Sequence, residues 1–242
     1  MDPIDHVDEY VSKPTFYDDV RAVYNESYAS KYQALYINRW QKKHRLNATN
    51  LASILGGLKS PLPRWLDLAC GQAWHFSIFP GRASMLGLDI SDAQLARARL
   101  MAPGASFVCG NMIEASFPEN SFDLITNFWA GYCYLPNRAC IAKLWRSTVD
   151  WIAPGGALYI EVLLGKDLET FNRSRFAGRT GFVVSPRCED YSEWEYDDTA
   201  GRHVMTSPPL EEILEVVSPF FDTVNARHDG DFMFHLIATG HR

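Results

Sequence analysis

The first candidates for chemistry in this sequence are a turn of small residues and an acid that follows it. A short apolar run, Trp65–Cys70, leads into Gly71, and a second run, Met85–Ile90, carries Asp89 near its end. Short runs of this kind are typical of buried parallel strands. An acid about 20 residues after such a turn can accept the hydroxyl groups of a ribose, and the turn lets a nucleoside approach the backbone. The pattern therefore predicts a nucleoside site.

The turn departs from the glycine pattern that binds dinucleotides. That pattern is Gly-x-Gly-x-x-Gly, but only Gly71 is present here, and Ala73 stands at the second glycine position. Trp74 and His75 follow, and their bulk disfavours a pyrophosphate on this turn. We therefore expect a cofactor with a nucleoside and no phosphate, and a dinucleotide oxidoreductase is disfavoured.

In order and spacing, the motifs resemble those of the class I S-adenosylmethionine-dependent methyltransferases. The resemblance covers residues 64–164 and the last two predicted strands, and its main segments are Leu66-Asp67-Leu68-Ala69-Cys70-Gly71, Leu88-Asp89-Ile90-Ser91, Gly110-Asn111-Met112 and Phe117–Ile125. It implies S-adenosylmethionine as cofactor and S-adenosylhomocysteine as product. By this resemblance Asp89 binds the ribose, Asp67 the amino group and Asn111 the adenine. The cofactor-binding residues expected here are Asp67, Ala69, Gly71, Asp89, Ile90, Asn111, Met112 and Asn127. At Ala73 the methyl group is expected to narrow the methionine pocket slightly.

A stripe of aromatic residues precedes these motifs. Tyr24, Tyr28, Tyr32, Tyr36 and Trp40 recur at four-residue spacing, which places them along one slowly drifting face of a helix. Such a stripe either packs against the core or forms a lid. The hydroxyl groups favour the lid, since a packing stripe would more naturally use Leu or Phe. This segment also resembles the N-terminal part of small-molecule N-methyltransferases, including amino-sugar dimethyltransferases, which predicts that Tyr24, Tyr28 and Tyr32 contact the cofactor.

A second aromatic cluster lies directly after the fourth predicted strand. We expect Phe128, Trp129 and Tyr132 there to bind the methyl acceptor, together with Trp194 from a later segment. An electron-rich wall also suits a cationic sulfonium.

Methyl transfer can depend mainly on positioning, and a general base is needed only when the acceptor must lose a proton. Tyr134 and His203 are the candidates for that catalytic role, whereas His235 lies in an apolar run and is more typical of a core residue. No residue that would orient either candidate is evident from the sequence. We expect no metal site, because neither Cys nor His residues have ligand spacing.

Strand-like and helix-like segments alternate from Trp65 onward, which is typical of βαβ units on a parallel sheet. We predict an α/β, Rossmann-like methyltransferase fold with a mostly parallel seven-stranded sheet, helices on both faces, an N-terminal helical lid and an antiparallel insert after the fifth strand. Predicted strands cover 65–70, 85–90, 107–109, 122–126, 157–162, 223–227 and 232–239, and predicted helices 14–55, 91–99, 137–152 and 210–217.

One methyltransferase domain, 1–242, is expected. Its parts are a helical lid (1–60), a cofactor-binding core (64–164), a substrate-side insert (166–208) and a closing helix with two strands (209–242).

Composition narrows the function. Hydrophobic residues make up 47% and charged residues 21%, close to a soluble average, and the net charge of −6 argues against a nucleic-acid partner. The N-terminus has no apolar signal region and the chain has no apolar run of about 18 residues, so we expect a cytoplasmic protein without a membrane partner. Among its 242 residues, the 32 Trp, Tyr and Phe are 13% of the chain.

Our leading hypothesis is methyl transfer from S-adenosylmethionine to a nitrogen or oxygen of a small, partly apolar metabolite in a biosynthetic pathway. A protein or peptide methyltransferase is one alternative. A methyltransferase-fold protein that binds the cofactor without transferring methyl is another.

Overall fold

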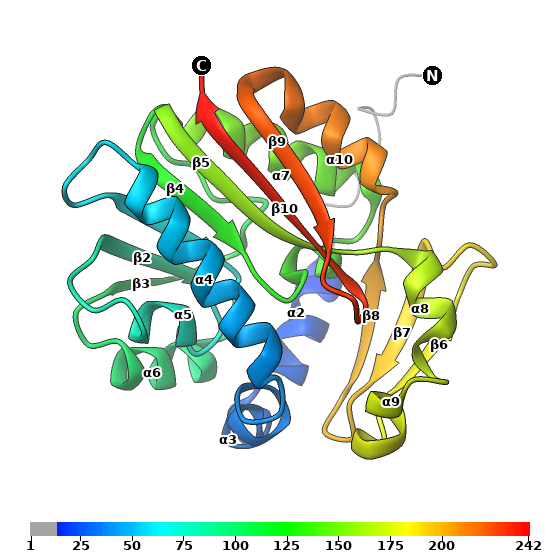
Figure 1. Ribbon diagram of the computed structural model, residues 1–242. Helices are drawn as coiled ribbons and strands as arrows, with labels where there is room; N and C mark the ends of the chain where they lie inside the picture. Colours follow the sequence, from blue (N-terminus) through cyan, green and yellow to red (C-terminus); the bar gives the residue numbers. More distant parts are fainter. Residues whose placement is uncertain (1–13) are drawn as a thin grey trace.

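The structure is a computed structural model that describes residues 14–242. A twisted seven-stranded sheet runs through the middle of the molecule, with strand order β3-β2-β1-β4-β5-β10-β9 (Figure 1). The strands are β1 (Arg64–Leu68), β2 (Ser84–Asp89), β3 (Ser106–Cys109), β4 (Phe122–Asn127), β5 (Ile152–Leu163), β9 (Phe221–His228) and β10 (Met233–His241). Strand β10 pairs antiparallel with β5 and β9, and the other neighbours pair parallel. The predicted Rossmann-like, mostly parallel sheet is confirmed.

Helices cover both faces of the sheet because successive strand residues point to opposite sides. Trp65 of β1 packs in one cluster with Leu51 of α4 (Gln41–Gly57). Its neighbour Leu66 belongs to the cluster on the other face, which includes Leu144 of α7 (Arg138–Trp151). Figure 1 shows α4 in front of the sheet and α7 with α10 (Leu210–Val217) behind it. Both clusters consist of large buried side chains, so the central strands are sealed from water.

Short helices fill the connections between the strands. They are α5 (Trp74–Ser77), α6 (Asp92–Met101) and the 3₁₀ turns η3 (Gly131–Tyr134) and η4 (Ser218–Phe220). The side chain of Ser91 caps α6, as its sequence suggests, by accepting a hydrogen bond from the Gln94 N–H. Pro154–Gly156, predicted to end the α7 pattern in a loop, lies within β5 as an irregularity where the pairing register with β4 shifts.

The N-terminal segment differs from the single predicted helix over 14–55. It consists of α2 (Pro14–Val23), α3 (Glu26–Tyr32), a π-helical turn η2 (Gln33–Ile37) and α4. Asn25 interrupts the helix and caps α3 by accepting from the Tyr28 N–H. On an α-helix, residues four positions apart are displaced by about 40° around the helix axis. The wider π turn, closed by a hydrogen bond from Asn38 N–H to Gln33 O at 2.9 Å, offsets that displacement.

The lid is shorter than predicted. Helix α4 packs on the sheet through Leu51, Ile54 and Leu55, so residues 41–57 belong to the core. Only the segment before them, from residue 14 to about 40, contributes side chains that face the cavity described below. Residues 1–13 of the predicted lid lie outside the described part of the chain.

The insert follows β5 as predicted. It contains α8 (Gly165–Phe171), α9 (Arg175–Thr180) and an antiparallel sheet of β6 (Val183–Pro186), β7 (Glu193–Asp197) and β8 (Arg202–Thr206), in that order. The two helices are not evident from the sequence pattern. Figure 1 shows the insert beside the end of the sheet at which β5 finishes, opposite α3. Between residues 14 and 242, no helix is long and apolar enough to cross a membrane.

Candidate cofactor and acceptor site

A cavity opens at the carboxyl ends of β1, β2 and β4, between the N-terminal segment and the insert. It measures about 1440 Å³ when its open mouth is included. Its lining comes from segments far apart in the sequence: the N-terminal helices, the carboxyl ends of the strands and the insert.

The turn after β1 forms the floor of the cavity. Its backbone takes the left-handed conformation at Ala69, Gly71 and Ala73, with φ of 56°, 52° and 55°. Ala69 and Gly71 line the cavity, but Ala73 is buried in the cluster around Phe76 and does not. The Ala73 methyl group therefore does not narrow the cavity, contrary to the expectation from the sequence.

Asp89 at the end of β2 is tied to this turn. Its Oδ2 accepts from the Gly71 N–H at 2.7 Å, and its Oδ1 accepts from the Ser91 N–H at 2.9 Å. Burial raises the pKa of Asp89, and the hydrogen bonds from Ser91 and Gly71 oppose that rise. Asp89 and Ile90 both line the cavity, so an oriented acid lies at the position predicted for ribose.

Asp67 in β1 is almost completely buried and also lines the cavity. Its Oδ1 accepts from the Thr126 hydroxyl at 2.6 Å. Burial raises the pKa of Asp67 to about 8, although the Thr126 hydrogen bond lowers it. A buried acid that faces a cavity with only one hydrogen bond suits a cationic partner, which fits the amino group of S-adenosylmethionine.

Of the remaining cofactor candidates, two line the cavity and one does not. Asn111 and Met112, directly after β3, line it as predicted. Asn127 does not: its Nδ2 donates to Leu68 O at 2.8 Å, and its Oδ1 accepts from the Tyr132 N–H at 3.2 Å. The Asn127 side chain thus holds the loop after β4 against β1.

The tyrosine stripe is brought to the cavity in part. Tyr24 and Tyr32 line it, whereas Tyr28 lies behind them and its hydroxyl donates to Asp198 Oδ2. Tyr36 also lines the cavity; its ring stacks on Tyr32 with centroids 4.8 Å apart, and its hydroxyl donates to Asp198 at 2.6 Å. The position of Tyr28 therefore does not support direct contact with a cofactor. The same four-residue spacing could have indicated Tyr36 and Trp40 as residues that line the cavity.

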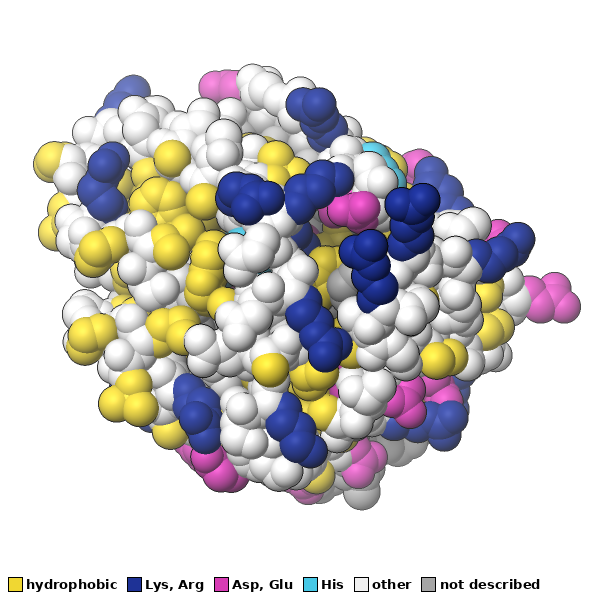
Figure 2. Space-filling model, turned by 60° about the horizontal axis from the view of Figure 1, so that its bottom comes forward, with side chains coloured by type: hydrophobic (Ala, Val, Ile, Leu, Met, Phe, Trp, Pro, Cys, Tyr) yellow, Lys and Arg dark blue, Asp and Glu magenta, His cyan; other side chains and the backbone are white. Residues whose placement is uncertain are grey.

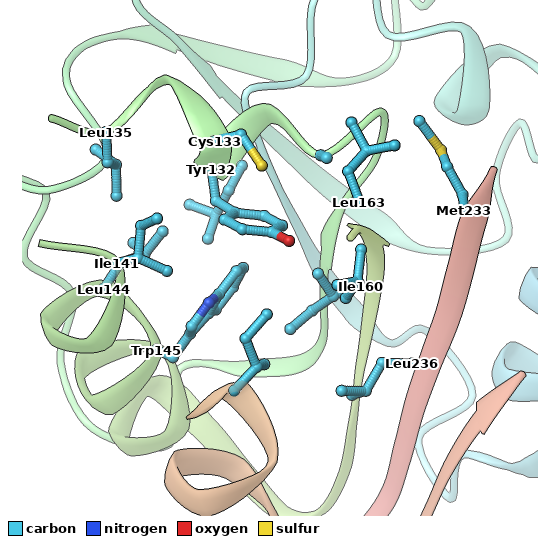
Figure 3. Packing of buried hydrophobic residues seen from close by; sticks show 14 of the residues in the cluster. Tyr132, Cys133, Leu135, Ile141, Leu144, Trp145, Ile160, Leu163, Met233 and Leu236 are labelled. Carbon is cyan, nitrogen blue, oxygen red and sulfur yellow. The ribbon is translucent and has the colours of Figure 1, made fainter. Parts of the chain in front are cut away.

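Aromatic side chains line another part of the cavity. Among them are Phe128, Trp129 and Trp194, which were predicted to bind the methyl acceptor. Tyr132 does not line the cavity, because its ring is buried against Trp145 of α7 with centroids 5.2 Å apart (Figure 3). The expectation for Tyr132 is corrected: in the short 3₁₀ turn it points into the core.

Trp129 is fixed by a buried ion pair. Its backbone, at φ 56°, donates to Glu161 Oε2 at 2.6 Å, and Glu161 Oε1 pairs with Lys43 of α4. Lys43 Nζ lies 4.5 Å from the centroid of the Trp129 ring, and both Lys43 and Glu161 are buried. The pair holds the wall of the cavity and does not itself line it.

Several wall residues were not predicted. His75 stacks on Phe128 with centroids 3.6 Å apart, and its place directly after the first motif could have indicated it. The others come from the lid, the insert and the β9–β10 turn: Tyr17, Val20, Trp40, Leu168, Phe171, Val184, Tyr196, Met205, Phe232 and Met233. No Lys or Arg within the described part of the chain lines this cavity.

The two catalytic candidates lie in contact with each other. Tyr134 lines the cavity, and its hydroxyl lies 2.7 Å from the Tyr24 hydroxyl and 2.9 Å from His203 Nδ1. His203 is buried behind it, and its Nε2 lies 3.3 Å from Asp198 Oδ2. The sequence did not reveal Asp198 as a neighbour of His203. Asp198 lies in the turn between β7 and β8, which reads only as a hairpin.

The surface at this end of the molecule has mixed character. Figure 2, which brings the bottom of Figure 1 forward, shows Lys and Arg side chains separated by hydrophobic and uncharged ones. No continuous basic stripe of the kind that tracks a nucleic-acid backbone is visible on this face.

Comparison with known proteins agrees with this geometry. Residues 66–156 match a family model described as a methyltransferase domain. Phthiotriol/phenolphthiotriol dimycocerosates methyltransferase of Mycobacterium tuberculosis is 32% identical over 96 residues, 38% of this chain and 34% of that protein. The chain thus matches about a third of the length of that relative.

Two further proteins match most of the chain. Trans-aconitate 2-methyltransferase of Acidovorax sp. is 28% identical over 223 residues, 80% of this chain and 82% of that protein. The S-adenosylmethionine-bound structure of CalS10, an amino pentose methyltransferase from Micromonospora echinaspora, superimposes with a TM-score of 0.60 at 21% identity, covering 86% of this chain and 96% of that one.

The sheet order and the match of residues 66–156 to a methyltransferase domain agree with the class I methyltransferase resemblance of the motifs, and acids lie at the ends of β1 and β2 as that resemblance implies. The same match supports S-adenosylmethionine as the cofactor predicted from the motifs.

Proposed function

We propose that this protein transfers a methyl group from S-adenosylmethionine to a nitrogen or oxygen of a small, uncharged and partly apolar metabolite. The observation that carries the proposal is the division of one cavity into two halves. One half has the acids Asp67 and Asp89 beside a small-residue turn, and the other is walled by aromatic and aliphatic side chains.

The first half has the donors and acceptors that the cofactor needs. Asp89 would hold the ribose hydroxyls, Asp67 the amino group, and Asn111 with Met112 the adenine. Tyr24 and Tyr32 would cover the sulfonium and the methionine part with electron-rich rings, a contact worth about 0.5–2 kcal/mol with a cation. When bound, the cofactor supplies an electrophilic methyl group on a cationic sulfur.

The second half favours an uncharged acceptor. Its walls offer tyrosine hydroxyls but no Lys or Arg side chain in the described part of the chain. A buried carboxylate without a cationic partner is costly, so an acceptor with several carboxylates, such as trans-aconitate, is disfavoured. Phe128, Trp129 and Trp194 instead suit an aromatic or aliphatic ring.

Cofactor binding tests the first half directly. Isothermal titration should show micromolar affinity for S-adenosylhomocysteine, and Asp89→Ala should abolish it, because the variant loses both ribose acceptors. Asp92→Ala is the matched control, since Asp92 is an exposed acid in the first turn of α6. Unchanged affinity in Asp89→Ala would contradict the assignment.

The acceptor class is tested with tritium-labelled cofactor and a cell extract. The proposal predicts label in the small-molecule fraction; label confined to protein bands would indicate a protein acceptor. Absence of any transfer from a protein that binds S-adenosylhomocysteine would indicate that it binds the cofactor without using it.

Asp67 gives a second, pH-dependent test. With its pKa raised to about 8, the carboxyl is mostly protonated at neutral pH in the free protein. A bound amino cation favours the carboxylate, so binding of S-adenosylhomocysteine near neutral pH should release about one proton. Titrations in two buffers with different heats of ionisation measure that proton. Asp67→Asn should abolish its release, and equal release in the variant would rule Asp67 out.

A further inference from the structure

A buried histidine and a buried acid lie behind the Tyr134 hydroxyl, which contacts Tyr24 of the N-terminal segment. Tyr134 Oη lies between Tyr24 Oη at 2.7 Å and His203 Nδ1 at 2.9 Å, and on the other side of the imidazole Nε2 is 3.3 Å from Asp198 Oδ2. We refer to Tyr134, His203 and Asp198 as the cavity triad. Of its members only Tyr134 lines the cavity.

The charge of Asp198 determines which nitrogen of His203 carries a proton and which hydroxyl groups donate. Burial raises the pKa of this carboxyl, but hydrogen bonds from His203, Tyr28 and Tyr36 outweigh burial and lower it to about 2. Asp198 is therefore a carboxylate that can only accept hydrogen bonds. Its Oδ2 lies 3.3 Å from Nε2, so in a neutral imidazole its charge favours the proton on Nε2 and leaves Nδ1 as an acceptor. Tyr134 then donates to Nδ1, and Tyr24 donates to Tyr134.

The remaining groups around His203 are neutral. Its ring lies 5.5–5.7 Å, centroid to centroid, from the rings of Tyr24, Tyr28, Tyr134 and Tyr196. Burial raises the pKa of all four phenols well above 10. Asp198 is thus the only charged group that faces this imidazole among the described residues, and it would stabilise a positive charge on it.

We propose, on the basis of the function inferred above, that the cavity triad is a proton relay that receives the proton of the methyl acceptor. The acceptor then belongs to the class of alcohols, phenols or amines, since it must carry an O–H or N–H. As the bond from this oxygen or nitrogen to the methyl carbon forms, the carbon–sulfur bond breaks and its electron pair stays on sulfur. The acceptor proton passes to Tyr134 Oη while the Tyr134 proton passes to His203 Nδ1, which leaves an imidazolium paired with Asp198.

Tyr134 is the catalytic residue in this scheme, and His203 and Asp198 act through it. A matched control exists in the same chain. Tyr159, His235 and Asp229 form a second set, the core triad, with Tyr159 Oη 2.6 Å from His235 Nδ1 and His235 Nε2 3.9 Å from Asp229 Oδ2. None of these three residues lines the cavity.

The first test needs no acceptor. Protein labelled with ¹⁵N-histidine is loaded with S-adenosylhomocysteine, and the His203 signals are assigned by comparison with His203→Gln. The relay requires the proton of neutral His203 on Nε2. A proton on Nδ1 would overturn the proposal, because Nδ1 would then donate to Tyr134 and could not receive a proton.

The second test is kinetic and uses para-substituted phenols and benzylamines as acceptors. Tyr134→Phe and His203→Gln should lower kcat by about 10²–10⁴-fold with little change in KM, and the loss should shrink as rising pH deprotonates the acceptor. Asp229→Asn and His235→Gln should keep the wild-type pH profile. A wild-type profile and kcat in His203→Gln would refute the relay.

These outcomes can be distinguished experimentally from failure of the proposed function. If the wild type does not bind S-adenosylhomocysteine, the proposed function fails. If it binds but methylates none of the panel, the position of the His203 proton alone decides on the relay.

Discussion

The cavity triad and the core triad use the same three residue types in nearly the same local structure. Each acid lies in the turn of an antiparallel hairpin, and each histidine lies on the strand that returns from it. Asp198 Oδ1 accepts from the backbone N–H groups of Ala200 and Gly201, and Asp229 Oδ1 accepts from those of Asp231 and Phe232. Hydrogen bonding to the backbone of a turn is thus a structural role that both acids have, and it would explain the presence of an acid at each position.

The triads differ in what surrounds the tyrosine. Tyr159 Oη donates to Asn47 Oδ1 and accepts from Asn50 Nδ2, both at 3.0 Å, in addition to its contact with His235. Tyr134 Oη has Tyr24 and His203 as partners, and Tyr134 is a residue of the cavity wall. A hydroxyl with three protein partners has no place for a fourth, whereas Tyr134 can accept one from a ligand. Residue type and spacing alone therefore do not distinguish a structural triad from a chemical one; access to the cavity does.

The largest expected effect lies beside the core triad. Lys43→Met should lower the free energy of unfolding by about 3–5 kcal/mol, because it leaves the Glu161 carboxylate buried without its cation. Urea unfolding measures the loss. The double variant Lys43→Met/Glu161→Leu should recover much of the stability, since replacing a whole buried pair by apolar residues is often nearly neutral. A loss below about 1 kcal/mol in the single variant would show that water reaches the pair.

A smaller effect separates the two tyrosines. Tyr159→Phe should cost about 1–3 kcal/mol, because Asn47, Asn50 and His235 lose a buried partner. Tyr134→Phe should cost less, about 1 kcal/mol, since water in the cavity can satisfy Tyr24 and His203 alone loses a buried partner. Urea unfolding of both variants, without ligand, gives the comparison. Equal losses would mean that Tyr134 is as enclosed as Tyr159.

The sequence predicts the features of this arrangement that depend on local pattern better than those that depend on contacts between distant segments. Most strands of the sheet were found because they are short apolar runs, and Asp89 was found from its spacing after the small-residue turn. Asp67 and Asn111 were found because their motifs resemble those of class I methyltransferases. These positions follow from local pattern and from motif resemblance.

The missed features depend on pairing between distant segments. Asp198 meets His203 only through the β7–β8 register, in which Tyr196 pairs with His203, and it meets Tyr28 and Tyr36 only because the lid lies on the insert. The difference between Tyr132 and Tyr134, two residues apart, comes from a 3₁₀ turn that sends one ring to Trp145 and the other to the cavity. Neither contact leaves a periodic signal in the sequence.

The smallest expected effect tests whether the acids of the two triads are held alike. Burial raises the pKa of each carboxyl, but nearby donors outweigh it and lower both values to about 2: His203, Tyr28 and Tyr36 at Asp198, and His235 with the backbone N–H groups of Asp231 and Met233 at Asp229. A folded-state pKa below the ordinary 3.8 stabilises the fold above about pH 4, and that stabilisation is lost as the pH falls toward 2.

After allowance for screening by solvent, each acid should contribute about 1 kcal/mol in this way. Urea unfolding of the wild type, Asp198→Asn and Asp229→Asn from about pH 6 to pH 2 should show two similar differences that both shrink toward acid pH. Similar curves would mean that both carboxylates are bound equally well, so that the triads differ only in the access of their tyrosines. A pH-independent difference for Asp198→Asn alone would mean that its carboxyl is not ionised, and the proton direction assigned to the cavity triad would then be wrong.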